Sequence, residues 1–299
     1  MKIVMLGAGA IGSLFGGYLA RENDVTLVCR KDHADAVNAK GLAITGLSKA
    51  TSRPKAVHSV AGLESPEILF LTVKAYDTAK AIGDIRKLKS SNTTLVSLQN
   101  GLGNLELLRD AFPDSAIVAG ITSQAAILRK PGTVEHTGIS YTVVGECQEA
   151  TKVAQLLNSA GLETTVSADI MAEIWYKAIV NSAINPVATL LGDKNRIISE
   201  RQDLAPLVEA IVKEGAAVAA SRGVALDRAE ALAKVMKVAR ETADNVCSMR
   251  LDMENGRRTE IMQMNGAIAS YGAEAGVPTP ANDIMATLVR AMGPKAYHY

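Results

Sequence analysis

Cysteine, net charge and long apolar runs are all scarce in this 299-residue sequence. Its three cysteines, Cys29, Cys147 and Cys247, lie far apart, which excludes a disulfide framework and the paired spacing of a zinc site. The net charge is +1 and no run of five basic residues occurs, so the composition gives no support for binding to nucleic acid or an anionic membrane. No apolar run is long enough for a membrane span or a signal peptide. These absences favour a cytoplasmic globular protein without a metal site.

The order of the predicted elements indicates two domains. Hydrophobic residues make up 48% of the chain and charged residues 21%, an ordinary globular balance. The first half alternates β-rich runs with helical stretches, which is typical of a doubly wound parallel sheet. From about Ser167 onward the patterns are helical. We therefore predict an α/β protein with a Rossmann-type domain at residues 1–167 and an all-α domain at 168–299. No Pro/Gly/Ser linker separates them, so we expect close packing and an active site in the cleft between them.

The sequence also predicts individual elements. In the first half it predicts strands at 2–6, 24–29, 68–73, 93–98 and 116–120, strand fragments at 43–44 and 55–57, a hairpin of 133–136 with 140–144, and helices at 13–20, 104–111 and 151–160. In the second half it predicts helices at 169–184, 204–222, 228–253, 259–275 and 282–292. Asp227 and Asn282 are the expected N-caps, and Gly276 the expected C-cap.

A glycine-rich turn follows the first predicted strand. It reads Gly7-Ala8-Gly9-Ala10-Ile11-Gly12, a G-x-G-x-x-G motif between a strand and a helix. In this motif the first glycine allows a tight turn, the second lets the backbone approach a pyrophosphate, and the third lets the helix pack close to the strand. The helix N-terminus adds free N–H groups and a positive dipole end. The turn predicts dinucleotide binding.

Two cations stand where an NAD-binding site would have an acidic residue. Arg30 and Lys31 follow the second predicted strand, whereas the nearest acids are Asp24 and Asp32. An acidic residue there holds the ribose 2′-hydroxyl of NAD, and an arginine accommodates the 2′-phosphate of NADP. We therefore predict NADP(H). In the alternative, the cations are solvent-exposed and Asp32 holds the ribose.

Polar residues follow two more predicted strands, at the edge where ligands bind in such sheets. Lys74 follows residues 68–73, and Asn100 lies in Gln99-Asn100-Gly101. Lys74 is suited to a phosphate, a ribose or an anionic substrate, and Asn100 to the nicotinamide ribose or the substrate. In the alternative, Lys74 belongs to a solvated loop and Asn100-Gly101 to a simple turn.

The predicted helix at 169–184 and the residues just after it carry a polar stripe on an otherwise apolar segment. Lys177, Asn181 and Asn185 are spaced i, i+4 and i+8, so they share one face. Such groups are costly to bury unless they face a wet cavity or a polar ligand. A lysine there suits a general acid for ketone reduction, because burial lowers its pKa toward neutrality. In the alternative, the stripe is the exposed face of an amphipathic helix.

Two further polar residues lie toward the C-terminus. Ser248 could hydrogen-bond a carboxylate, and Glu260 could orient a lysine or a substrate hydroxyl. In the alternative, Ser248 bonds its own backbone and the helix dipole stabilises Glu260.

Taken together, these segments resemble the ketopantoate reductase (2-dehydropantoate 2-reductase) family nearly end to end. The matching pieces are GAGAIG, LTVKA, QNGLGN, GITSQAA, EIWYKAIVNSAINP, DNVCSM and RRTEIMQMNG. The resemblance implies NADPH-dependent reduction of 2-dehydropantoate to (R)-pantoate, a step of pantothenate and coenzyme A synthesis. It implies that Lys177 is the general acid and that Glu260 is its partner carboxylate. It implies that Glu260 also contacts the cofactor. It further implies cofactor contacts by Arg30, Lys74, Asn100 and Ala126, and substrate contacts by Asn100, Lys177, Asn181, Asn185, Asn195 and Ser248.

Two other functions stay open. One is a reductase of the same build acting on a different 2-oxo acid, because fold does not fix substrate. The other is a non-catalytic NADP(H)-binding sensor, against which Lys177, Asn181 and Glu260 argue. Met253, Met262 and Met264 fit either a homodimer interface or, as we prefer, core packing.

Overall fold

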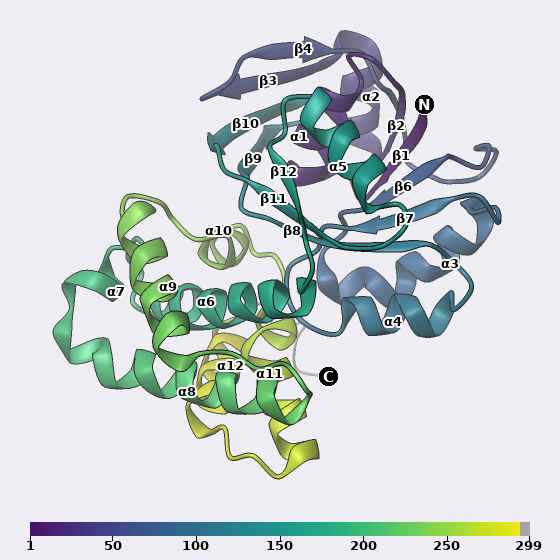
Figure 1. The fold of residues 1–299 in the computed structure, drawn as a ribbon. Coiled ribbons are helices and arrows are strands. Elements are labelled where there is room, and N and C mark those ends of the chain that lie inside the picture. The colour runs from purple at the N-terminus through teal and green to yellow at the C-terminus, as the bar shows by residue number, and fades with distance from the viewer. Residues whose placement is uncertain (294–299) are drawn as a thin grey trace. The chain divides into compact units, whose positions relative to one another are not determined.

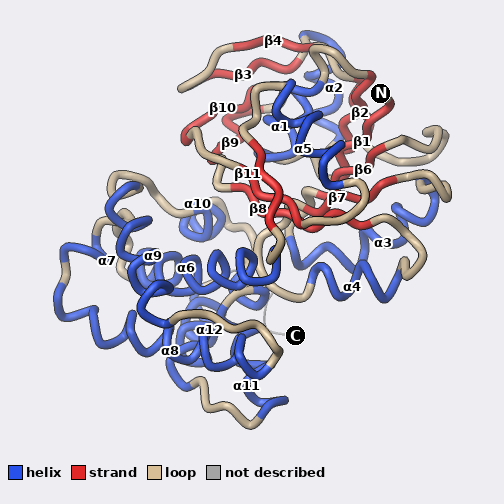
Figure 2. The backbone as a smooth tube through the Cα atoms, in the orientation of Figure 1, coloured by secondary structure: helices blue, strands red, loops and turns tan. Residues whose placement is uncertain are grey.

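The computed structural model describes residues 1–293 and divides them into two compact units. The first unit, the sheet unit, comprises Met1–Gln99 and Asn104–Ile170. The second, the helical unit, comprises Asn100–Gly103 and the chain from Met171 onward. Every strand of the described residues belongs to the sheet unit, as the red segments of Figure 2 show. None of the helices in residues 1–293 combines the length and apolar character that crossing a bilayer requires.

An eight-stranded, mostly parallel sheet forms the centre of the sheet unit (Figure 1). Its strands run in the order β12-β11-β8-β7-β6-β1-β2-β5, and only the β8–β11 pairing is antiparallel. This topology confirms the predicted doubly wound fold. The strands are β1 (Lys2–Leu6), β2 (Asp24–Val28), β5 (Lys55–Val57), β6 (Ile68–Leu71), β7 (Thr94–Ser97), β8 (Ile117–Thr122), β11 (Thr142–Gly145) and β12 (Thr164–Ser167).

Helices cover both faces of this sheet. On one face α1 (Ala10–Leu19), α2 (Lys31–Lys40) and α5 (Ala150–Ser159) share an apolar core with the strands. On the other face α3 (Thr78–Leu88) and α4 (Asn104–Ala111) do the same. Two helices, α2 and α3, are not among the elements predicted from the sequence. The α2 segment KDHADAVNAK buries only His33, Ala34 and Val37, which is too little apolar periodicity to stand out.

A second sheet corrects the predicted hairpin of 133–136 with 140–144, which is wrong. Its order is β4 (Ala50–Ser52), β3 (Leu42–Gly46), β10 (Thr133–Gly138) and β9 (Ala125–Lys130). The tight turn is at Pro131-Gly132, where Gly132 has φ +76°, so β10 pairs with β9. Thr137-Gly138 instead ends β10, and the chain then enters β11 of the main sheet.

The helical unit is built from seven α-helices within the described residues. Two predicted helices, 228–253 and 259–275, are wrong as continuous segments because each is interrupted. Residues 242–247 form a loop that pairs with the 193–196 segment through Asn195 N–H to Asn245 O, 3.1 Å, and Arg196 N–H to Ala243 O, 3.1 Å. A short 3-10 turn, η3 (Ile261–Gln263), precedes the last two helices. The helices are α6 (Ile170–Leu190), α7 (Ile197–Glu200), α8 (Ala205–Ser221), α9 (Arg228–Glu241), α10 (Ser248–Glu254), α11 (Asn265–Ala275) and α12 (Pro280–Met292).

The helix ends confirm two of the three predicted caps. Asp227 accepts a hydrogen bond from the Glu230 N–H at 2.7 Å, and Gly276 ends α11 in the left-handed conformation. Asn282 is wrong as an N-cap because it lies inside α12 with a buried side chain. The Glu214 carboxylate of α8 caps α12 instead, accepting from the N–H groups of Ala281 and Asn282 at 2.9 Å each.

Candidate functional site

The glycine turn has the backbone geometry that its sequence predicts. Gly7 has φ +91°, and a Cβ there would lie 2.5 Å from the Val73 nitrogen. A Cβ at Gly12 would collide with the Thr72 hydroxyl, so this glycine lets α1 approach the chain after β6. At Gly9 a Cβ would meet only the Gly7 oxygen, 3.9 Å away. The two outer glycines are therefore required by packing, whereas Gly9 faces open space.

The N-terminus of α1 offers unpaired donors at this turn. Gly9 is the N-cap residue and makes no side-chain cap. The N–H groups of Ala10 and Ile11 have no acceptor within residues 1–293. Together with the helix dipole, these donors suit an anion such as a pyrophosphate. The open approach at Gly9 is what a dinucleotide needs, so the residues present fit that group.

The carboxyl ends of the neighbouring strands meet at this turn. Leu6 pairs with Val28 on one side and with Leu71 on the other. The residues that follow, Gly7, Arg30 and Lys74, therefore leave the same edge of the sheet. Lys74 is partly buried at the start of a 3-10 turn, Ala75–Asp77.

Arg30 and Lys31 differ in their surroundings. Arg30 is exposed and precedes α2 as its N-cap residue. Lys31 is also exposed, but its Nζ lies 2.7 Å from the Asp35 carboxylate one helical turn away. Within the part of the chain that the structure describes, Arg30 has no such partner. Arg30 is therefore the better placed of the two for a phosphate.

Gln99, which the sequence analysis did not propose as a site residue, ties two strand ends together. Its amide nitrogen donates to the Val73 oxygen at 3.1 Å and to the Thr78 hydroxyl at 2.8 Å. Its amide oxygen accepts from the Ser97 hydroxyl at 3.2 Å. Because Val73 precedes Lys74, this buried amide fixes the backbone from which Lys74 projects. A polar residue directly after a buried strand was the only sequence signal for it.

Asn100 begins the short segment that belongs to the helical unit. Gly101 has φ +86°, and a Cβ there would lie 2.6 Å from the Gln263 oxygen. The Leu102 N–H donates to the same oxygen at 2.8 Å. Gln263 ends η3, which begins directly after Glu260. The structure therefore places Asn100 in the same unit as Lys177 and Glu260.

Lys177 lies on α6, and Asn181 and Asn185 follow at successive turns of that continuous helix. Lys177 and Asn181 are partly buried and Asn185 is buried, so the stripe is not a solvated face. Burial lowers the pKa of Lys177 from its ordinary value of 10.5 to about 8, and the negative charge of Glu260 opposes this shift. A lysine of this pKa holds its proton at neutral pH and can release it easily.

Glu260 is the carboxylate that acts on Lys177. It precedes η3 and is only 5% exposed. Its charge favours the protonated form of Lys177, as expected for a nearby opposite charge. The structure thus brings together the two residues predicted to be catalytic.

The other predicted site residues have mixed surroundings. The Asn185 amide nitrogen contacts the Met264 sulfur at 3.9 Å. Asn195 is buried and donates to the Thr242 hydroxyl at 2.9 Å, whereas its Oδ1 has no partner within residues 1–293. Ser248 is exposed at the first position of α10. Ala126 is partly buried in β9, opposite His136.

The backbone of α6 contains a proline, Pro186, one residue after Asn185. Proline has no N–H, so the Ser182 carbonyl loses its helical hydrogen bond. The Asn265 amide of α11 donates to that carbonyl at 3.1 Å and to the Asn282 amide oxygen at 3.0 Å. Asn265 thereby joins α6 to α11 close to the predicted substrate residues, a link the sequence analysis missed.

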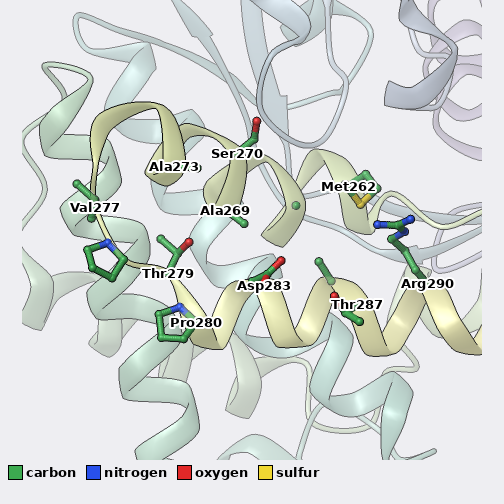
Figure 3. Close-up of a pocket in the computed structure, with 13 residues that line it drawn as sticks. Met262, Ala269, Ser270, Ala273, Val277, Thr279, Pro280, Asp283, Thr287 and Arg290 are labelled. Atoms are coloured by element: carbon green, nitrogen blue, oxygen red, sulfur yellow. The ribbon is translucent and has the colours of Figure 1, made fainter.

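A cavity of about 510 Å³ lies between α11 and α12, and Figure 3 shows the residues that line it. Thr279, Asp283 and Arg290 line it from one side, and Met262 and Ser270 from the other. None of the predicted catalytic or substrate residues lines it. The predicted catalytic pair, Lys177 and Glu260, therefore lies outside the lining of this cavity.

The chain matches known proteins over nearly its whole length. The family Ketopantoate reductase PanE/ApbA matches residues 3–149, and its C-terminal counterpart matches residues 169–293. A 2-dehydropantoate 2-reductase of Pyrococcus abyssi is 38% identical over 97% of both chains, and one of Archaeoglobus fulgidus is 36% identical over the same shares.

Solved structures agree with this match. A PanE/ApbA family ketopantoate reductase from Ralstonia eutropha JMP134 has a TM-score of 0.92 at 26% identity, covering 100% of both chains. A D-mandelate dehydrogenase solved with NADH and anilino(oxo)acetate has a TM-score of 0.91 at 30% identity, covering 98% of both chains. The chain belongs to the ketopantoate reductase PanE/ApbA family.

Proposed function

We propose that this protein reduces 2-dehydropantoate to (R)-pantoate with NADPH, and so serves pantothenate and coenzyme A synthesis. The observation that carries the proposal is Lys177, a partly buried lysine whose pKa of about 8 suits a general acid, with Glu260 acting on its charge. Relatives named 2-dehydropantoate 2-reductase, 36–38% identical over nearly the whole chain, support the choice of substrate.

The nicotinamide cofactor, when bound, supplies the hydride that reduces the keto carbon. Lys177 donates a proton from Nζ to the carbonyl oxygen as that oxygen gains negative charge. Glu260 keeps Lys177 protonated before the reaction, because its charge favours the ammonium form. Asn181, Asn185, Asn195 and Ser248 hold polar atoms of the substrate, and Asn100 serves both substrate and cofactor. The turn at residues 7–12 binds the pyrophosphate through its backbone N–H groups.

The preference for NADPH over NADH rests on Arg30. Its guanidinium is exposed at the end of β2 and suits bidentate contact with a 2′-phosphate. Lys31 adds less, because Asp35 already balances its charge. Lys74, Ala126 and Glu260 complete the proposed set of cofactor contacts.

A second candidate is a reductase for another 2-oxo acid. The similarity to D-mandelate dehydrogenase, 30% identical with a TM-score of 0.91, favours it as the main competitor. That relative was solved with NADH, so it differs in both substrate and cofactor. A non-catalytic NADP(H)-binding sensor is the third possibility, and it gives no reason for a lysine of lowered pKa beside a carboxylate.

One set of assays separates these candidates. Initial rates of NADPH and NADH oxidation are measured with 2-dehydropantoate, phenylglyoxylate and linear 2-oxo acids. We expect the highest kcat/KM for 2-dehydropantoate with NADPH, whereas a higher value for another acid would favour the second candidate. Lys177→Ala should lower kcat by about 10²–10⁴-fold. A loss of less than threefold would refute the general-acid role, and no turnover of any acid by the wild type would favour the sensor.

A further inference from the structure

A buried histidine lies beneath the glycine turn and takes no part in the chemistry proposed above. His33, on the first turn of α2, is 2% exposed. Its ring contacts two other segments of the sheet unit: α1, and the turn between β9 and β10. A polar ring at such a position must have its nitrogens satisfied, and both are.

The hydrogen bonds of His33 run in one direction. The Gly132 N–H donates to Nδ1 at 3.0 Å, so Nδ1 carries no proton. Nε2 therefore carries the hydrogen and donates to the Ser13 hydroxyl at 3.0 Å. The Ser13 hydroxyl in turn donates to the Ala8 carbonyl at 3.2 Å. The chain of bonds starts at the β9–β10 turn and ends on the glycine turn.

These hydrogen bonds hold the carbonyl group of Ala8, and β2 holds its N–H group. The Ala8 N–H donates to the Val28 oxygen at 2.9 Å. With its carbonyl held through Ser13, the orientation of the Ala8–Gly9 peptide is set, and the Gly9 N–H of that peptide donates to the Gly7 oxygen at 2.7 Å. The unpaired N–H groups of Ala10 and Ile11 follow directly, where the pyrophosphate is proposed to bind. Ser13 is fully buried, so no solvent molecule competes for these bonds in the folded protein.

We propose that His33 is a positioning residue for the dinucleotide, holding the phosphate-binding turn in its binding shape through Ser13 while its ring is neutral. The proposal rests on the proposed binding of NADP(H) by the glycine turn, but not on the identity of the 2-oxo acid. A protonated ring would turn an N–H toward the Gly132 N–H, and the repulsion between these two donors would displace the ring and break its bond to Ser13.

Burial keeps the ring neutral near pH 7. Burial lowers the pKa of His33, Asp32 raises it, and Arg30 lowers it. The α1 helix and the β9–β10 turn present neutral groups to the ring, namely the Ser13 hydroxyl and the Gly132 N–H. The nearby cation Lys130, at the end of β9, is exposed. The positioning effect should therefore hold at pH 7 and weaken only as the pH falls below 6.5, the ordinary histidine pKa.

Two substitutions test the two hydrogen bonds of the His33 ring separately. In His33→Asn the amide can replace Nδ1 and accept from Gly132, but it does not reach Ser13. In His33→Gln the amide can replace Nε2 and donate to Ser13, but it leaves the Gly132 N–H without an acceptor. The Kd for NADP⁺ is measured by calorimetric titration and the Tm by differential scanning, both for the intact chain.

We expect His33→Asn to raise the Kd about fivefold, the effect of about one hydrogen bond, with kcat at saturating cofactor within twofold of the wild type. His33→Gln should keep the Kd within twofold and lose several degrees in Tm. Ser13→Ala should raise the Kd about as much as His33→Asn does. The double variant, Ser13→Ala with His33→Asn, should bind NADP⁺ no more weakly than either single variant. An unchanged Kd in His33→Asn, or an equal loss of affinity in both histidine variants, would overturn the proposal.

A pH series gives a readout that a purely structural role would not move. As the pH falls below 6.5, the ordinary histidine pKa, the Kd of the wild type should rise more steeply than that of His33→Gln, whose amide does not titrate. The 2′-phosphate also titrates there, but equally for both proteins. Parallel pH profiles would contradict the proposal. Failure to reduce 2-dehydropantoate would refute the proposed function alone, whereas a wild type that bound no NADP⁺ would refute both.

Discussion

The Asn265 side chain donates a 3.1 Å hydrogen bond to the Ser182 carbonyl, the group that Pro186 deprives of its partner within α6. A proline inside a helix ordinarily costs about 3 kcal/mol, partly through this lost bond. Here a side chain from α11 supplies the missing donor. The helix that carries Lys177, Asn181 and Asn185 can therefore continue to Leu190.

The first prediction tests this compensation. Asn265→Ala should lower the free energy of unfolding by about 1–3 kcal/mol, because it leaves the buried Ser182 carbonyl unpaired. In a Pro186→Ala background, the new backbone N–H can reach that carbonyl, so the same substitution should cost about 1 kcal/mol less. Urea unfolding of the four proteins measures the coupling. Asn255→Ala, which removes an exposed amide bond to Leu251, is the matched control and should show no coupling to Pro186. Equal costs of Asn265→Ala in both backgrounds would show that Asn265 does not replace the lost bond.

The second prediction concerns the pH dependence of turnover. In the proposed mechanism Lys177 must be protonated to act, and its pKa is about 8. The kcat/KM for 2-dehydropantoate should therefore be level near pH 7 and fall about tenfold per pH unit above about pH 8. Glu260→Gln removes the charge that raises this pKa, so the falling limb should move to lower pH. Rate profiles from pH 6 to 10 locate the falling limb in the wild type and in Glu260→Gln. A limb at the same pH in both proteins would show that Glu260 does not act on the pKa of Lys177.

The third prediction contrasts two glycines of the same turn. Gly9→Ala places a methyl group in open space, so the Tm should stay within about 2 °C while the Kd for NADP⁺ rises at least tenfold. Gly12→Ala forces a methyl group onto the Thr72 side chain, and such overpacking costs about 1–3 kcal/mol of stability. Thermal unfolding and cofactor titration of each variant give the comparison. Normal affinity in Gly9→Ala would argue against a pyrophosphate at that position.

The fourth prediction addresses the choice between NADPH and NADH. Arg30→Ala should lower kcat/KM for NADPH about 10- to 100-fold, since charge-assisted contacts are worth about 1.5–3 kcal/mol, and should leave NADH nearly unchanged. Lys31→Ala is the control, and its effect should be several-fold smaller because Lys31 pairs with Asp35. If both variants lost NADPH activity equally, the distinction between them would be wrong.

The sequence predicted the fold best where one local signal was strong. The glycine motif fixed the β1–α1 turn, and Asp227 and Gly276 marked the helix ends where the structure has them. The hairpin prediction failed because Thr137-Gly138 and Pro131-Gly132 both resemble turns, and only the strand pairings separate them. Asn282 failed as a cap because Glu214, far away in sequence, performs that role.

The candidate site divides in the same way. The spacing of Lys177, Asn181 and Asn185 predicts a shared face, because helix geometry is local. Roles that depend on contacts between distant segments were not accessible. Gln99, His33 and Asn265 each act through partners far along the chain, namely Thr78, Gly132 and Ser182. No residue spacing in the sequence predicts such pairs.

The turn at Gly101 also constrains how the protein is made. Residues 100–103 leave the ribosome among the strands of the sheet unit, yet their packing partner Gln263 is synthesised near the end of the chain. Until then Leu102, which is buried in the finished protein among apolar residues such as Trp175 and Ile268, has no core to enter. A nascent or truncated chain ending after β12 should therefore expose this leucine to solvent. The exposed side chain is then available for binding by chaperones or for aggregation, until the helices that bury it have been synthesised.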